Sequence, residues 1–124
     1  MQSPKAANKI PTVEKSSVER RIDTRRPFRS HATVIAGGRE LSVRTLDLSR
    51  SGVCIVSPVD AQPRMRFRLR LRIDCQLQGM VTFETDVQVM HSVLAASEAG
   101  FRVGLQFIQP SPQLISAIAR LFAS

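Results

Sequence analysis

The chain has 124 residues, 43% of them hydrophobic, and its 18 lysine and arginine residues outnumber its 10 acidic ones to give a net charge of +8. This length predicts a single domain with a small core. No apolar run approaches the roughly 18 residues that a membrane-spanning helix needs, so we expect no membrane insertion. The charge favours an anionic partner, such as a nucleic acid, a nucleotide, an acidic lipid or an acidic protein surface.

The first segment, residues 1–24, is polar and shows no sustained hydrophobic period. Such a segment cannot bury enough apolar surface to offset the entropy of ordering it, so we predict a flexible basic tail here and a folded domain over residues 25–124. The segment also lacks the apolar run of a secretory signal, which predicts a cytoplasmic protein.

Strand-like patterns begin after residue 30. Residues 31–36 and 40–47 flank Gly37 and Gly38, which predicts a hairpin with a tight turn, because glycine accepts the positive φ that such turns need. One face of the second strand is expected to hold Leu41, Val43 and Thr45.

Further strands are predicted at residues 53–56, 64–73, 80–91 and 101–107. In residues 64–73 five arginines alternate with five apolar residues, the first of which is Met65. A period of two places the arginines on one face of the sheet and the apolar side chains on the other.

The period becomes helical at the C-terminus. Ser111 is a suitable N-cap and Pro112 suits the first helical position. Five apolar residues follow at helical spacing, namely Leu114, Ile115, Ile118, Leu121 and Phe122. The predicted fold class is mainly β: a six-stranded antiparallel β-barrel with a flexible N-terminal tail and a C-terminal α-helix that plugs or flanks the barrel.

Signatures of catalysis and metal binding are missing from the sequence. It contains no P-loop, nucleophile elbow or dinucleotide fingerprint, and His31 and His91 have no partner at metal-ligand spacing. Acidic residues are sparse, and no two are expected on one face. Cys54 and Cys75 suit neither a zinc site nor a disulfide framework, so we expect both to be buried. We predict that the protein is not an enzyme and has no catalytic residue, metal or cofactor.

The arginine ladder, as we call Arg64, Arg66, Arg68, Arg70 and Arg72, allows two interpretations. Arginines two apart on a strand lie roughly 6.5–7 Å apart, close to the phosphate spacing of a nucleic-acid strand. They also suit a solvated outer face whose charge protects the strand from edge-to-edge aggregation. We favour the second, because nucleic-acid-binding barrels add exposed aromatic residues and the chain has no Trp or Tyr.

A separate arginine cluster, RRPFR, occupies residues 25–29 just before the first long strand. A guanidinium can bind a phosphate through two parallel hydrogen bonds, or bind O6 and N7 of guanine in the same plane. Arg25, Arg26 and Arg29 therefore suit a ligand that carries both phosphates and guanines. Taken alone, such a cluster is also typical of a solvated basic tail.

The turn DLSRSG, residues 47–52, follows the second strand. Asp47 and Ser49 have short polar side chains that can bond the local backbone or a ligand edge. Gly52 permits a positive φ or a close approach of a ligand to the backbone. Taken alone, these residue types are also common in ordinary turns.

Together, R-x-x-x-R before the first strand and D-x-S-x-x-G after the second resemble the paired signature of the PilZ domain family. The segment from Gly104 to Phe107, GLQF, is similar to the closing strand common in that family, and the resemblance covers about residues 25–122. It implies a six-stranded antiparallel barrel that binds the bacterial second messenger cyclic di-GMP, singly or as a stacked pair.

The resemblance also implies roles for individual arginines. Arg25 and Arg29 would hold guanine edges and phosphates, with Arg26 as an additional contact. In the family this segment is mobile without ligand and wraps over the dinucleotide. Arg21 creates a second R-x-x-x-R with Arg25, and we prefer the later pair because Arg29 adjoins the first strand.

In the DLSRSG turn, the resemblance implies that Asp47 and Ser49 meet a guanine edge and that Gly52 shapes the turn. We therefore expect a cytoplasmic, stand-alone bacterial adaptor that closes its arginine segment over cyclic di-GMP and signals to an unidentified protein effector. Motility, surface polysaccharide and virulence outputs are all compatible with the family.

Two rival hypotheses come from other classes. A small basic barrel that binds RNA or single-stranded DNA would lose affinity steeply with salt, although the shortage of aromatic residues makes a nucleic-acid partner the weaker hypothesis. A PilZ-like interaction module that has lost its ligand is the other rival, and the intact motif residues, Arg25, Arg29, Asp47, Ser49 and Gly52, speak against it.

Overall fold

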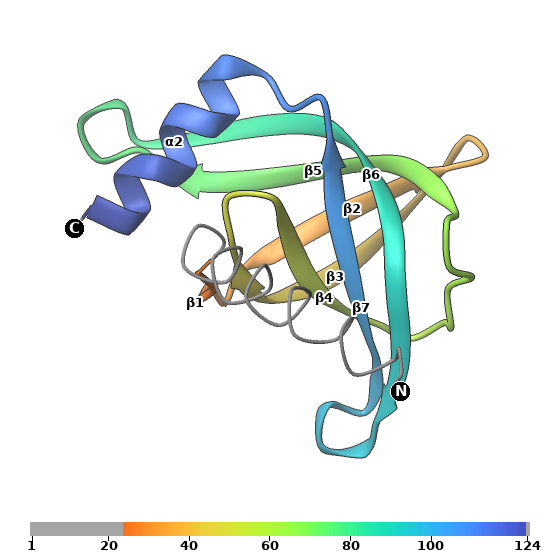
Figure 1. Ribbon diagram of the computed structural model, residues 1–124. Helices are drawn as coiled ribbons and strands as arrows, with labels where there is room; N and C mark the ends of the chain where they lie inside the picture. Colours follow the sequence, from red (N-terminus) through yellow and green to blue (C-terminus); the bar gives the residue numbers. More distant parts are fainter. Residues whose placement is uncertain (1–23, 124) are drawn as a thin grey trace, which may run out of the picture.

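The computed structural model describes residues 24–123, and the predicted flexible tail therefore lies, except for Thr24, outside the described residues. Figure 1 shows a β-barrel with one helix across an end. The strands are β1 (Arg26–Pro27), β2 (His31–Ala36), β3 (Arg39–Leu48), β4 (Gly52–Ser57), β5 (Arg66–Asp74), β6 (Met80–Ala95) and β7 (Gly100–Ile108). The helix is α2 (Pro112–Ala123), and two 3-10 turns are η1 (Gln76–Gln78) and η2 (Ala96–Glu98).

The six longer strands form a closed antiparallel barrel, which confirms the predicted fold class. The strand order is β1-β3-β2-β5-β6-β7-β4, and a further pairing of β3 with β4 closes the ring. The short strand β1 adds to the end of β3. Closure removes the exposed edges that an open sheet would leave.

The predicted hairpin is confirmed between β2 and β3. Gly37 and Gly38 have φ values of 57° and 75°, and Ala36 pairs with Arg39 across them. Two consecutive positive φ angles match the twist of the strands on either side.

Apolar side chains alternate into the barrel as predicted and form one main core. Leu69 and Leu71 of β5 and Val87 of β6 are fully buried. The core also contains residues from every other long strand and from α2, including Val43, Leu48, Ile55, Val103 and Ile118.

Two residues expected in the inner apolar rows are exposed. The side chains of Leu41 and Met65 are 38% and 44% exposed. Leu41 lies near the start of β3 and Met65 just before β5, at the barrel end away from α2 (Figure 1). No helix covers that end among the described residues, so it stays open.

The arginine ladder lies on the outer face, and two of its five arginines, Arg68 and Arg70, pair with acidic residues. Arg68 Nη2 lies 3.1 Å from Asp86 Oδ1, and Arg70 Nε donates to Glu84 Oε2 at 2.9 Å. Arg70 Nη2 lies 3.2 Å from a carboxylate oxygen of Glu40 as well. The expectation that no two acidic residues share a face is therefore wrong, because Glu84 and Asp86 lie opposite Arg70 and Arg68 in register. Opposed charges of this kind stabilise a sheet by about 0.2–1 kcal/mol each.

The C-terminal helix plugs one end of the barrel. Its residues Leu114, Ala117 and Ile118 are buried and belong to the main core. Ile115, which was expected on the apolar face, is 50% exposed, because it lies on the side of the helix away from the barrel. Both cysteines are buried and free, as expected. Within residues 24–123 no helix is long and apolar enough to cross a bilayer.

The first turn of α2 depends on Ser111, whose Oγ accepts a hydrogen bond from the Leu114 N–H at 3.1 Å. Removing an N-cap hydroxyl typically costs about 1 kcal/mol. We expect Ser111→Ala to lower the free energy of unfolding by about that amount in urea denaturation. Ser116→Ala, on the exposed face of the same helix, is the control, and alanine there is expected to be neutral or slightly stabilising. Equal losses in the two variants would contradict the capping role.

Candidate functional site

Asp47 points out of the barrel because β3 shifts its register just before it. The pairing of β3 with β4 skips one residue between Thr45 and Asp47, so that Leu46 is extra. Such a bulge changes which face the following residues occupy. Strict alternation from the buried Thr45 would bury Asp47, whereas the structure buries Leu48 instead. The sequence prediction missed this shift. The signal for it is that an acidic residue, Asp47, stands between two leucines, Leu46 and Leu48.

The arginine segment, residues 25–29, lies beside this bulge. In β1, Arg26 pairs with Leu48 and Pro27 pairs with Asp47. The pairing places the guanidinium groups next to the Asp47 carboxylate, although about 20 residues of chain separate them.

Phe28 and Thr45 anchor the backbone of the arginine segment to β3. The Phe28 N–H donates to the carbonyl of Leu46 at 2.9 Å, and the Phe28 ring packs against the main core. Thr45 Oγ1 donates to the Phe28 carbonyl at 2.6 Å and accepts from the Ser30 N–H at 2.9 Å. Thr45 is 1% exposed, so it is a buried positioning residue that the sequence prediction did not identify.

Arg25 and Asp47 form an ion pair at the surface. Arg25 Nη1 donates to Asp47 Oδ1 at 2.8 Å, and the two side chains are 47% and 32% exposed. An exposed pair of this kind contributes at most about 1 kcal/mol to stability. Its main consequence is geometric, because it holds a guanidinium and a carboxylate side by side and open to solvent.

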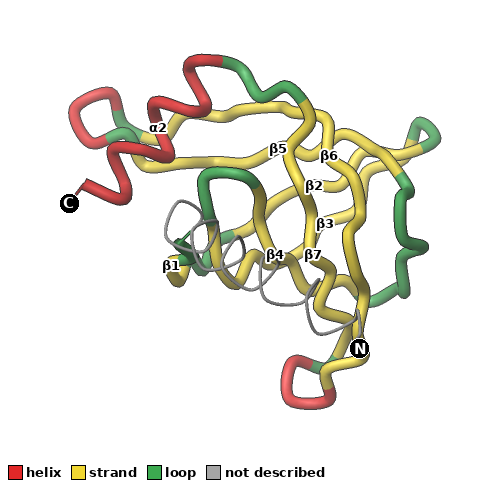
Figure 2. Tube along the Cα trace, in the orientation of Figure 1, coloured by secondary structure: helices red, strands yellow, loops and turns green. Residues whose placement is uncertain are grey.

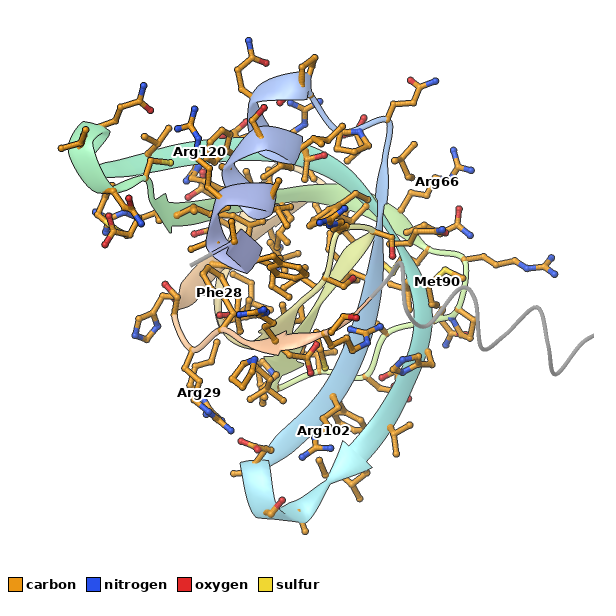
Figure 3. The ribbon with its side chains drawn as sticks, turned by 60° about the vertical axis from the view of Figure 1, so that its left-hand side comes forward. Phe28, Arg29, Arg66, Met90, Arg102 and Arg120 are labelled. Atoms are coloured by element: carbon orange, nitrogen blue, oxygen red, sulfur yellow. The ribbon has the colours of Figure 1, made fainter. Side chains whose placement is uncertain are left out.

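Arg26 and Arg29 have different surroundings. The Arg26 guanidinium lies over the ring of Phe122, 5.3 Å from its centroid, which is a cation–π distance. Figure 3 shows Phe28 beside the end of α2 and Arg29 extending away from the helix, on the side where Arg102 lies. Arg29 is therefore exposed and directed at solvent.

An open pocket of about 330 Å³ connects these groups. It is lined by Arg25, Arg26, Pro27, Arg29, Leu46, Asp47, Cys54 and Arg102. The lining contains four guanidinium groups and one carboxylate, so the pocket has an excess of positive charge that suits an anion. The structure thus brings Arg25, Arg26, Arg29 and Asp47 together as the sequence predicted, and adds Arg102.

Arg102 reaches the pocket from β7, a strand in which the sequence prediction named no site residue. Its Nη2 lies 3.7 Å from a carboxylate oxygen of Glu98. Arg44 also holds Glu98, by donating to its backbone carbonyl at 2.9 Å. Glu98 therefore orients Arg102. The sequence did contain a signal for Arg102: in the alternating pattern of this strand it lies between two inward residues, Phe101 and Val103, and therefore points outward.

Cys54 forms part of the pocket floor. Burial raises the pKa of its thiol, and Asp47 acts in the same direction, whereas Arg25 and Arg102 lower the pKa. The thiol therefore stays protonated at neutral pH. With Leu46 and Val56 it belongs to a small buried apolar cluster, and Cys54 and Leu46 both contribute apolar lining to the pocket.

Ser49 and Gly52 hold the turn that follows Asp47. Ser49 is fully buried, and its Oγ accepts from the Gly52 N–H at 3.0 Å. The Ser49 N–H in turn donates to the Gly52 carbonyl at 2.8 Å. Neither residue lines the pocket, so in this conformation both shape the turn without facing the site.

The structure gives a steric reason for a glycine at position 52. Gly52 is not among the described residues with positive φ. Instead, a Cβ built on Gly52 would lie 2.0 Å from the carbonyl oxygen of Leu105. The backbone of β7 therefore approaches Gly52 closely.

The polar groups that line the pocket are chemically complementary to guanine and phosphate groups. Guanine N1–H and N2–H are donors that suit a carboxylate, whereas its O6 and N7 are acceptors that suit a guanidinium. Among the described residues, no three His, Cys, Asp or Glu side chains gather as a metal site would require.

The sequence matches the PilZ domain family over residues 19–124. This match covers most of the chain. The chain belongs to the PilZ domain family. No curated protein sequence matches it.

Solved PilZ-type structures share the fold of this PilZ domain. The Bacillus subtilis inhibitor of motility MotI/DgrA aligns with a TM-score of 0.72 and 14% identity, over 80% of this chain and 47% of its own. Escherichia coli YcgR in complex with c-di-GMP aligns with a TM-score of 0.65 and 20% identity, over 83% of this chain and 44% of its own. The PilZ domain of Escherichia coli YcgR with c-di-GMP aligns with a TM-score of 0.58 and 20% identity, over 82% of this chain and 88% of its own. This PilZ domain thus spans less than half the length of the first two proteins.

A test of the turn is Gly52→Ala. We expect a loss of about 3 kcal/mol in the free energy of unfolding, because the new methyl group meets the rigid backbone of β7. Gly104→Ala is the matched control, since the atoms nearest to its Cβ would be those of the His91 ring, a side chain that can rotate away. Urea denaturation measures both. A Gly52→Ala loss no larger than that of Gly104→Ala would contradict the backbone contact.

Proposed function

We propose that this PilZ domain is a receptor that binds cyclic di-GMP in the pocket between the arginine segment and β7. The observation that carries this proposal is the contact of Arg25 with Asp47 at 2.8 Å in a pocket otherwise rich in arginine. Membership of the family and the c-di-GMP complexes of YcgR support the choice of ligand.

A guanine base can insert between Arg25 and Asp47 without leaving either group unsatisfied. Asp47 would accept from N1–H and N2–H of the base, while Arg25 donates to O6 and N7. The direct ion pair would thus be replaced by two charge-assisted contacts through the base. Arg29 and Arg102 would then hold the phosphates, and Arg26 would be an additional contact.

Ser49 and Gly52 contribute to this function by holding the turn that presents Asp47. Their burial gives them an indirect role, in place of the direct guanine contact that the motif suggested for Ser49.

The closing movement that we propose is a movement of arginine side chains. The backbone at Phe28 is already hydrogen-bonded to β3, so Arg25 and Arg29 can fold over a ligand while the segment stays attached. Arg26 lines both the arginine pocket and a second pocket beside Phe122 of α2. A ligand that engages Arg26 would therefore change its contact with the helix, which offers a route for signalling to a protein effector.

The central test is calorimetric titration with cyclic di-GMP. We expect binding by the unmodified protein, and affinity roughly 10- to 100-fold lower in Arg25→Ala, Arg29→Ala and Asp47→Ala, because each removes charge-assisted hydrogen bonds. Arg72→Ala is the matched control, since Arg72 is an exposed arginine of β5 that does not line the pocket. Absence of binding by the unmodified protein at micromolar concentrations would overturn the proposal. Unchanged affinity in all three variants would overturn the site.

A competition experiment separates this receptor from a nucleic-acid-binding barrel. The ladder arginines Arg68 and Arg70 are already paired with carboxylates, so we expect a single-stranded RNA oligonucleotide not to displace fluorescent cyclic di-GMP. Unlabelled cyclic di-GMP is the positive control. Displacement by RNA that weakens steeply with salt would instead favour nucleic-acid binding.

A further inference from the structure

The end of the barrel away from α2 contains an apolar cavity that the nucleotide site does not use. The cavity has a volume of about 220 Å³. Its wall includes Val34, Ile55, Phe67 and Val103 from four different strands. Figure 1 shows this end, formed by the β2–β3 turn and the β4–β5 loop, on the opposite side of the barrel from α2. We call it the barrel mouth.

Three large apolar side chains at the barrel mouth are exposed to solvent. Leu41, Val59 and Met65 line the cavity and are 38%, 60% and 44% exposed. Single exposed apolar residues are common, but several that line one concavity mark a binding surface. The cavity is smaller than the ~300–1,000 Å³ typical of small-molecule sites, so it suits a large side chain from another protein.

The charge around the barrel mouth is positive and unpaired. Arg39 lines the cavity, and Arg64 and Arg66 flank Met65 in the sequence. Within residues 24–123, none of these three arginines forms an ion pair with an acidic side chain. This distinguishes them from Arg68 and Arg70 on the same sheet face, which are paired. A partner segment with acidic residues would complement this rim.

The single carboxylate in the cavity wall does not reverse this charge pattern. Asp60 Oδ1 accepts hydrogen bonds from the Ser92 hydroxyl at 2.5 Å and from the Ala61 N–H at 2.9 Å. These bonds hold the β4–β5 loop against β6, and Figure 2 shows that loop along the side of the barrel. Asp60 thus serves to fix the rim.

Backbone strain at the same rim supports a functional role. Arg64 has a φ of 72°, a conformation that is uncommon for a residue with a side chain. Its N–H donates to the Val89 carbonyl at 2.7 Å, and the Val89 N–H donates to the Met65 carbonyl at 2.8 Å. These bonds keep Met65 at the cavity. Strain held in place by surrounding contacts is typical of binding sites.

Two other surfaces are weaker candidates for the effector. The central ladder residues, Arg68 and Arg70, are neutralised by neighbouring carboxylates. The apolar residues of α2 face the core, with Ile115 the exposed exception. Neither surface combines exposed apolar side chains with unpaired charge.

We propose that the barrel mouth binds an acidic segment of the effector protein, with one large apolar side chain of that segment in the cavity. The inference rests on the part of the proposed function that assigns a protein effector. The same strands serve both sites: Cys54 and Arg102 line the arginine pocket, while their sequence neighbours Ile55 and Val103 point inward and line the barrel mouth.

The test uses a short fluorescein-labelled peptide in which glutamate and aspartate flank one phenylalanine, and fluorescence anisotropy with the full chain. We expect saturable binding that weakens about tenfold or more in Val59→Asp, because an acidic group at the cavity repels the peptide and removes an apolar contact. Val93→Asp is the matched control, since Val93 is similarly exposed, at 58%, but does not line the cavity. It should bind as the unmodified protein does.

A second pair of variants tests the charge. Arg39→Glu should also weaken binding about tenfold or more, whereas Arg72→Glu, outside the barrel mouth, should not. A peptide with serine in place of phenylalanine should bind about tenfold more weakly than the parent peptide. No binding of the parent peptide, or equal losses in Val59→Asp and Val93→Asp, would overturn the inference.

The two proposals fail separately in this design. Peptide binding is measured without nucleotide, so it tests the barrel mouth even if cyclic di-GMP does not bind. Nucleotide binding in Val59→Asp and Arg39→Glu should equal that of the unmodified protein, because neither residue lines the arginine pocket. Loss of nucleotide binding together with peptide binding would show that these changes disturb the whole barrel and would count against a distinct second site.

Discussion

The register shift between Thr45 and Asp47 is the constraint on which the site depends. One extra residue in β3 sends Asp47 outward and Leu48 into the core. Without it, a carboxylate would occupy a fully apolar interior, which is strongly unfavourable. The same short stretch provides the edge to which β1 pairs, so the arginines and the aspartate reach one another because of a single local irregularity.

Charge pairing divides the many arginines of this PilZ domain into two functional groups. On β5 the central arginines face acidic residues of β6 in register, and their charge is largely satisfied within the sheet. Four arginines and one aspartate line the arginine pocket. Arg25 pairs with Asp47 and Arg102 with Glu98, so positive charge remains in excess there. The net charge of +8 therefore overstates how much of the surface is available to an anion. The arrangement of the acidic residues, more than the number of arginines, decides where an anion binds.

The barrel also places the two proposed binding surfaces on the two faces of the same strands. Because side chains alternate across a strand, Arg102 lines the arginine pocket while Val103 lines the barrel mouth. If cyclic di-GMP and an effector bind as proposed and one changes the affinity for the other, the change must be reciprocal and by the same factor.

Much of the fold could be predicted from the sequence because its signals are local. The alternation in residues 64–73, the Gly37–Gly38 turn and the Ser111 cap each specify their own element, and the structure confirms all three. The R-x-x-x-R and D-x-S-x-x-G patterns indicated the family in the same way, and the family match supports it. The tertiary structure alone decided that Asp47 faces outward, that Arg102 joins the pocket, and that Ser49 and Gly52 are buried in the turn and do not line the pocket. These properties depend on a skipped residue in one strand pairing and on which distant strands lie side by side, and a local hydrophobic period carries no information about either.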